Sequence, residues 1–166
     1  MREFRLTIAA AGLAAAGFCI ADGVAQTAEA PFTAAQAAAG RAAYATSCAG
    51  CHQANLAGSG EQPALAGPSF MASWGKRSIK DFYEDIRANM PYGRAGSLDT
   101  AAYQNITAFI LSANGAKPGS KAFEGGATTL ISSVATGQVP ANVAAAARRG
   151  GGDEGEGGGG RAPTMK

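Results

Sequence analysis

Cys48-Ala49-Gly50-Cys51-His52 is the stretch of sequence that decides the fold. Two residues separate the cysteines, so their sulfurs lie a short turn apart, about as far as the two vinyl groups on one porphyrin edge. The histidine that follows is placed to ligate an iron at the centre of the ring. This C-x-x-C-H spacing is typical of covalent haem attachment. A redox dithiol and half of a zinc site are the alternatives.

The N-terminal residues have the layout of a secretory signal. Arg2 and Arg5 precede an apolar, uncharged run from Leu6 to Ile20, and Asp22-Gly23-Val24-Ala25 offers small residues before a cleavage point. The apolar run is shorter than the about 20 residues that a membrane-spanning helix needs. We therefore expect a signal peptide over residues 1–25 and a periplasmic, bacterial protein. Membrane attachment is expected only if the signal stays uncleaved.

Charge and cysteine content narrow the function further. The net charge of +2 is too small to predict binding to nucleic acid or to an anionic membrane. Signal removal would leave Cys48 and Cys51, which in an exported protein could form a disulfide, but the adjacent histidine favours haem attachment. A structural zinc ion needs four ligands, whereas the chain has a single histidine. A thioredoxin-like dithiol would follow a strand, whereas an alanine-rich helix is expected here.

The composition predicts one folded domain, over residues 31–115. Residues 116–149, rich in Gly, Ala, Ser and Thr, are expected to form a poorly ordered extension, in which Ala141 to Arg149 is a candidate short helix. Residues 150–166 are glycine-rich and are expected to be disordered, because they cannot bury enough apolar surface. A covalent haem would supply much of the core that so small a domain needs.

Three helices are expected in this domain. The capping box Thr33-Ala34-Ala35-Gln36 begins a helix that runs to about Ser47. Further helices are expected over 78–89 and 99–113, whereas 53–75 is a Gly-, Pro- and Ser-rich loop. No segment alternates with a period of two. The sequence therefore predicts an all-α fold of three to five helices, with long loops around one covalent haem. The loop side chains expected to cover the ring are Leu56, Leu65, Phe70 and Trp74.

Two positions on the first helix predict how it packs. Gly40 and Tyr44 are four residues apart and therefore share one face. A glycine inside a helix costs about 1 kcal/mol against alanine, so we expect close approach by a second helix at Gly40. The helix over 99–113 carries an apolar face and is the expected partner.

A second axial ligand to the iron would have to come from elsewhere in the chain. Met90 follows the predicted helix over 78–89, and Pro91 disfavours the α conformation at Met90. Met71, beside Phe70, is the rival ligand. Either methionine could instead be a filler of the core.

Several independent spacings give the chain a family resemblance. Over about residues 32–115 it resembles a class I c-type cytochrome, and Met90 to Asn114 is similar to bacterial cytochromes that serve periplasmic quinoprotein dehydrogenases. The residues that carry the resemblance are Gly40, Tyr44, Leu65-Ala66-Gly67-Pro68, Trp74, Met90-Pro91, Ile106 and Phe109.

The resemblance implies a role for each matching residue. Cys48 and Cys51 would hold one haem c through thioether bonds. His52 and Met90 would be the two axial ligands of its iron. The remaining implied contacts are a hydrogen bond from His52 to the Pro68 carbonyl and a contact of Trp74 with a haem propionate.

These residues predict an electron-transfer protein rather than an enzyme. Two protein ligands would fill both axial positions, and methionine sulfur raises the reduction potential. The expected partners are a dehydrogenase donor and an oxidase or other cytochrome as acceptor, and the chain could be the haem subunit of a dehydrogenase complex. A five-coordinate haem protein that binds a small gas or reacts with peroxide is the alternative.

Cations near the helix over 78–89 bear on the choice of partner. Three acidic residues, Asp81, Glu84 and Asp85, share this helix, which favours a solvated face of mixed charge. Steering of an acidic partner is the alternative hypothesis. The cations are Lys76, Arg77, Lys80, Arg87 and Arg94.

Overall fold

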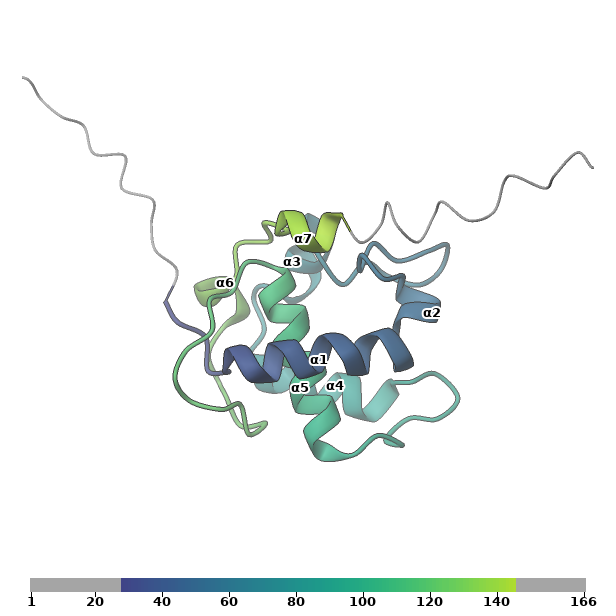
Figure 1. The fold of residues 1–166 in the computed structure, drawn as a ribbon, viewed down its shortest axis with the longest axis horizontal. Helices are drawn as coiled ribbons and strands as arrows, with labels where there is room; N and C mark the ends of the chain where they lie inside the picture. Colours follow the sequence, from purple (N-terminus) through teal and green to yellow (C-terminus); the bar gives the residue numbers. More distant parts are fainter. Residues whose placement is uncertain (1–27, 146–166) are drawn as a thin grey trace, which may run out of the picture.

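A computed structural model describes residues 28–145, which contain seven helices and no strand (Figure 1). The predicted all-α fold is confirmed. The helices are α1 (Ala34–Ser47), α2 (Ala49–His52), α3 (Pro68–Trp74), α4 (Ile79–Asn89), α5 (Thr100–Ala113), α6 (Ile131–Val134) and α7 (Ala141–Ala144). Five of them lie within 31–115, as many as the sequence predicts at most. The predicted signal peptide and glycine-rich tail lie outside the described residues.

Side-chain caps fix where the three long helices begin. At α1, the Thr33 hydroxyl accepts from the Gln36 N–H and the Gln36 side chain accepts from the Thr33 N–H, both at 3.2 Å. Ser78 and Asp81 form the same reciprocal pair at α4, with both bonds at 3.1 Å. At α5, Asp99 accepts from the Ala102 N–H at 2.7 Å. The predicted starts of these helices are therefore confirmed, because each depends on residues within one turn.

The crossing of α1 and α5 is the most extensive contact between two helices in the described fold (Figure 1). Gly40 lies at the crossing, where a methyl group would overlap the Asn105 carbonyl and approach the Phe109 Cβ to 2.9 Å. The Tyr44 ring packs at a tilt against Phe109, with ring centroids 5.3 Å apart. The predicted close approach at Gly40 is confirmed.

The helix α3 differs from the sequence prediction of a continuous loop over 53–75. Gly67 has φ +83° and Pro68 is at the first position of α3, where a proline is well tolerated. Phe70 and Trp74, four residues apart, both pack edge-on against Phe82 of α4, with ring centroids at 5.2 and 4.8 Å. Packing against α4 therefore stabilises a helix that the glycine- and proline-rich composition does not predict.

Residues 116–145 also differ from the expected poorly ordered extension. Their backbone pairs with the start of α4: the Ile79 N–H donates to the Thr129 carbonyl at 3.0 Å and the Lys80 N–H to the Ala127 carbonyl at 2.8 Å. Several of their apolar side chains lie in the core: Phe123 and Val143 are buried, and Ile131 and Val134 are fully buried. We therefore correct the expectation: residues 116–145 form part of the packed domain. The candidate helix at 141 is the short helix α7 as far as the structure describes it.

Asn114 connects the end of α5 to two other segments. Its buried side chain accepts from the Gly67 N–H and donates to the Leu65 carbonyl, both at 2.9 Å. Its backbone carbonyl accepts from the Thr136 and Gly137 N–H groups at 3.0 and 2.9 Å. One residue thus fixes the loop before α3, through its side chain, and the extension, through its backbone, to the same helix end.

Gly40→Ala tests the α1–α5 crossing. The substitution is expected to lower the free energy of unfolding by at least about 2 kcal/mol, because the new methyl group meets backbone that cannot move aside. This loss would occur despite the better helix propensity of alanine, worth about 1 kcal/mol. Urea unfolding of the purified protein measures it.

Gly126→Ala is the matched control, since a Cβ there meets no atom within 4 Å. It should leave stability unchanged within error. A Gly40→Ala protein as stable as wild type would show that α1 and α5 do not approach so closely.

Candidate functional site

The C-x-x-C-H residues form a tight helical turn between α1 and the following loop. Cys48 ends α1 and precedes α2, and its carbonyl accepts from the Cys51 and His52 N–H groups at 3.1 and 2.9 Å. Cys48 and Cys51 are not joined by a disulfide; Cys48 is half-buried and Cys51 exposed. Burial, with a smaller contribution from nearby Cys51, raises the pKa of the Cys48 thiol to about 11. Both sulfurs are thus available for covalent attachment.

His52 is buried and its ring is held in one orientation. Only 7% of the residue is exposed, and Nδ1 lies 2.9 Å from the Pro63 carbonyl oxygen. A carbonyl can only accept, so Nδ1 carries the proton and Nε2 presents a lone pair. Imidazoles that ligate a metal are commonly fixed in this way by a backbone carbonyl.

The proline whose carbonyl accepts from His52 is not the one that the resemblance implied. The resemblance implied Pro68, but Pro68 begins α3 and the acceptor is Pro63. The chain turns back soon after the motif: the Gly58 N–H donates to the His52 carbonyl at 3.1 Å, and the Leu65 N–H donates to the Leu56 carbonyl at 2.8 Å. This turn places the first proline after the motif beside the histidine.

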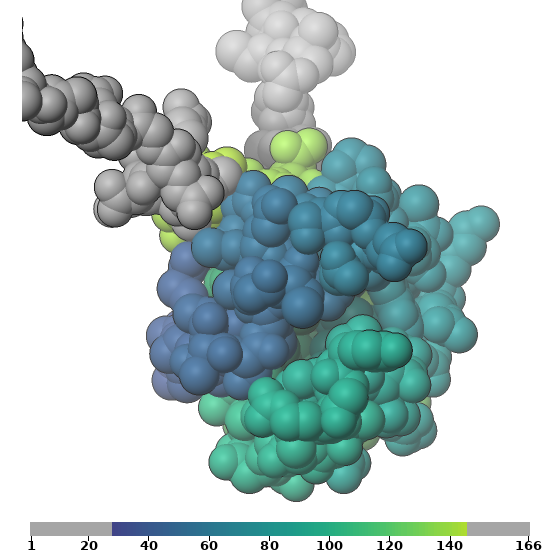
Figure 2. Space-filling view, turned by 90° about the vertical axis from the view of Figure 1, so that its right-hand side faces the viewer, coloured from purple at the N-terminus to yellow at the C-terminus, as the bar shows by residue number. Residues whose placement is uncertain are grey.

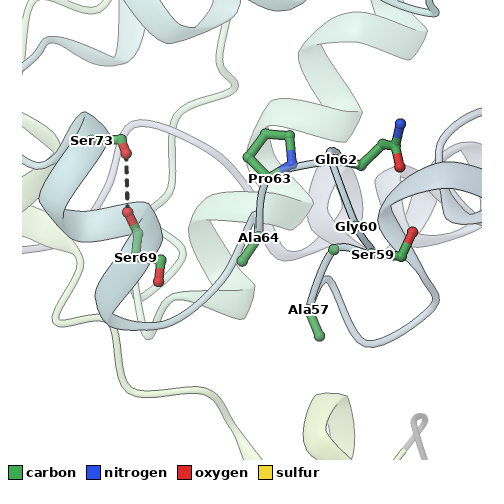
Figure 3. A pocket seen from close by; sticks show the side chains of 9 residues that line it. Ala57, Ser59, Gly60, Gln62, Pro63, Ala64, Ser69 and Ser73 are labelled. Carbon is green, nitrogen blue, oxygen red and sulfur yellow. Dashed lines mark hydrogen bonds between the residues drawn. The ribbon is translucent and has the colours of Figure 1, made fainter.

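The loop that carries Pro63 can be followed in Figure 3, beside the Ser69 and Ser73 side chains of α3. A depression of about 420 Å³ lies over this loop. The residues that line it carry no charge and no titratable group. It is lined by Ala57, Gly58, Ser59, Gly60, Gln62, Pro63, Ala64, Ser69 and Ser73. This depression therefore adds no charged or titratable group to the candidate haem site.

Two further hydrogen bonds hold the motif against its surroundings. The Tyr44 hydroxyl of α1 donates to the Gln53 carbonyl at 2.9 Å, and the Ser59 hydroxyl donates to the Cys51 carbonyl at 3.0 Å. Burial, with a smaller contribution from Cys48, raises the pKa of the Tyr44 phenol, so it remains a hydrogen-bond donor in neutral solution. Sequence reasoning gave Tyr44 a packing role only, because a bond to a backbone carbonyl leaves no sequence signal.

Met90 lies at the end of α4 with an extended backbone. Its partly buried side chain packs against the core, and its carbonyl accepts from the Tyr103 hydroxyl of α5 at 2.7 Å. Figure 2 shows the surface hollowed between the segment that contains α2 and the loop from α4 to α5. Met90 begins this loop and His52 ends α2, so the two candidate ligands come from the segments on either side of the hollow.

The rival methionine lies in a different part of the fold. Met71 is in α3, and a methyl group on Gly137 would approach the Met71 Cγ to 2.7 Å. The side chain of Met71 therefore packs against the extension. Met165 lies outside the described residues.

Trp74 lies between an aromatic ring and a cation. Its ring packs against Phe82, and the Arg77 guanidinium lies over it, 4.8 Å from the ring centroid. The implied contact of Trp74 with a propionate stays a prediction.

The donor set of the site fits a covalent haem. Two cysteine sulfurs share one turn, and the adjacent imidazole presents Nε2 from a buried, hydrogen-bonded ring. The helix α1 leads into the motif, where a redox dithiol would follow a strand. Within residues 28–145, no group of three or more His, Cys, Asp or Glu side chains could hold a metal ion such as zinc. In the same part of the chain, no helix is long and apolar enough to cross a membrane.

Comparison with known proteins agrees with this chemistry. Residues 35–110 match the family model described as cytochrome c oxidase, cbb3-type, subunit III, which is a c-type cytochrome domain. No curated protein and no solved structure gives a match. The matched residues run from α1 into α5 and include Cys48, Cys51, His52, Pro63 and Met90. Residues 35–110 therefore form a class I c-type cytochrome domain, with haem c attached covalently to Cys48 and Cys51.

Proposed function

We propose that this cytochrome is a periplasmic electron carrier whose iron is ligated by His52 and Met90. The observation that carries the proposal is the fixed His52 ring, buried and bonded through Nδ1 to the Pro63 carbonyl at 2.9 Å. This bond leaves Nε2 as the ligating atom and increases its basicity. The bound haem supplies one-electron chemistry between Fe(II) and Fe(III).

The arrangement of the two methionines supports Met90 as the second ligand. Met71 packs against Gly137 of the extension, whereas Met90 begins the loop at the hollow seen in Figure 2. The Met90 backbone is held at both of its polar groups, since its N–H donates to the Ile86 carbonyl at 2.9 Å and its carbonyl accepts from Tyr103. A thioether presented from a fixed backbone suits a permanent axial ligand.

Ligation by both residues has a functional consequence. No axial position would remain for a substrate or a gas, so the protein would exchange electrons without binding a reactant at the metal. Methionine ligation also raises the reduction potential, within the span of about 0.8 V that axial ligands give haem proteins. The alternative function, a five-coordinate site that binds a small gas or reacts with peroxide, would apply if Met90 did not ligate.

The proposed partners follow from location and family. An export signal over residues 1–25 would bring the chain to the periplasm, where c-type haem is attached. A periplasmic dehydrogenase is the proposed donor, and an oxidase or another cytochrome the acceptor. The chain could act as the haem subunit of a dehydrogenase complex. The name of the matching family, an oxidase subunit, supports a role in respiratory electron transfer without assigning a partner.

The surface charges support docking with little electrostatic steering. Three of the five cations near α4 interact with a neighbouring side chain. Lys80 pairs with Glu84 at 2.6 Å, and Arg77 and Arg87 lie over aromatic rings. The segments 49–60 and 90–98, on either side of the hollow, contain one formal charge, on Arg94. A solvated mixed face fits this distribution better than a basic docking patch.

Met90→Ala tests the proposed ligation. Ferric wild type is expected to be low-spin and to show the weak far-red band of a methionine–iron bond, and its ferrous form should bind CO poorly. Met90→Ala should lose this band, become high-spin, bind CO readily and have a lower reduction potential, because a ligating sulfur is gone. Absorption spectra and a redox titration measure these changes.

Met71→Leu is the matched control, since it removes the rival sulfur and keeps the side-chain volume. It should retain the far-red band. A band that survives in Met90→Ala but disappears in Met71→Leu would reverse the assignment. A high-spin wild type that binds CO would favour the five-coordinate alternative.

The charge distribution predicts a weak dependence on salt. Oxidation of the ferrous protein by anionic ferricyanide and by a cationic cobalt(III) complex can be followed by stopped flow. The rate constants are first corrected for the effect of ionic strength on the activity coefficient of each oxidant. They should then change less than about threefold between low and high ionic strength, whereas an electrostatically steered encounter would change them tenfold or more. A strong preference for the anionic oxidant at low salt would instead indicate a basic docking surface.

A further inference from the structure

We propose that Tyr103 is the positioning residue that keeps Met90 on the iron, an inference that rests on the proposed ligation by Met90. The residue is in α5, 1% exposed, and its hydroxyl donates to the Met90 carbonyl at 2.7 Å. The same oxygen lies 3.5 Å from the Leu98 N–H at the far end of the loop. One phenol therefore contacts both ends of the segment that presents the ligand.

The loop between α4 and α5 has few other polar anchors in the described fold. Within the loop, backbone bonds run from the Arg94 N–H to the Pro91 carbonyl at 2.8 Å, from the Ser97 N–H to the Arg94 carbonyl at 3.1 Å and from the Gly96 N–H to the Met90 carbonyl at 3.4 Å. The bond from the Met90 N–H to the Ile86 carbonyl joins the start of the loop to α4, but none of these bonds joins the loop to α5. The Tyr103 hydroxyl supplies that connection.

Tyr103 itself has little freedom to move. It lies in the first turn of α5, which Asp99 caps, and its own carbonyl accepts from the Thr107 hydroxyl at 2.9 Å. Its ring is part of the buried core. The hydroxyl is therefore a fixed donor, and a Met90 carbonyl that moved away would leave a buried hydroxyl without this acceptor.

This bond should bias the equilibrium between ligated and displaced Met90. A typical hydrogen bond inside a protein changes such an equilibrium by roughly two- to tenfold. A ligand shifts the two states only by its different affinity for them. An external nitrogen ligand that competes with Met90 for ferric iron should therefore bind more tightly once the hydroxyl is removed.

The test is an imidazole titration of ferric holoprotein at fixed pH, followed by loss of the far-red methionine–iron band. Tyr103→Phe keeps the ring and removes the hydroxyl, and should lower the apparent Kd for imidazole roughly two- to tenfold. Tyr83→Phe is the control: Tyr83 of α4 is also a buried tyrosine, 5% exposed, and its ring packs against Phe123 of the extension. It should leave the Kd unchanged.

Urea unfolding of both variants separates positioning from stability. A Kd that changes in Tyr103→Phe and not in Tyr83→Phe would support the proposal, whichever variant loses more stability. An unchanged Kd in Tyr103→Phe, or equal changes in both variants, would overturn it. Met90→Ala is measured alongside: if the far-red band survives in it, the proposed ligation fails, and this result is distinguishable from failure of the Tyr103 proposal alone.

Discussion

The hydrogen bond between His52 Nδ1 and the Pro63 carbonyl is the constraint on which the site depends. A histidine beside two cysteines could adopt either tautomer and several ring orientations. The carbonyl selects the tautomer in which Nε2 is unprotonated, and burial keeps water away from the ring. The turn that brings Pro63 to His52 is held in turn by the bond between Leu65 and Leu56. The ring nitrogen that is free to ligate a metal is thus set by backbone geometry about ten residues further along the chain.

The rest of the fold holds two segments in place around the hollow. The crossing of α1 and α5 at Gly40 fixes the helix that ends at Cys48 against the helix that carries Tyr103. Asn114, at the end of α5, fixes the loop before α3 and the extension. The helix α5 therefore connects the cysteine–histidine side of the site, the Met90 side and the extension. Small movements of α5 would therefore shift both the segment that carries His52 and the loop that begins at Met90.

Local signals in the sequence were sufficient for much of this architecture. The caps at Thr33, Ser78 and Asp99 act within one turn, and the glycine at position 40 has a steric reason that sequence spacing reveals. Features that depend on distant backbone atoms could not be predicted in the same way. The choice of Pro63 over Pro68 depends on a turn, and α3 depends on packing against Phe82.

The packing of the extension could not be predicted either, because a composition of small residues gives no sign of the backbone bonds to the start of α4. The central claim, that this chain carries one haem on two sulfurs, is tested most directly by the mass of the purified protein measured under denaturing conditions. The account predicts the mass of the polypeptide plus one haem, with both Cys48 and Cys51 unreactive toward thiol reagents. A colourless chain of polypeptide mass, with these two cysteines free or joined to each other, would contradict it.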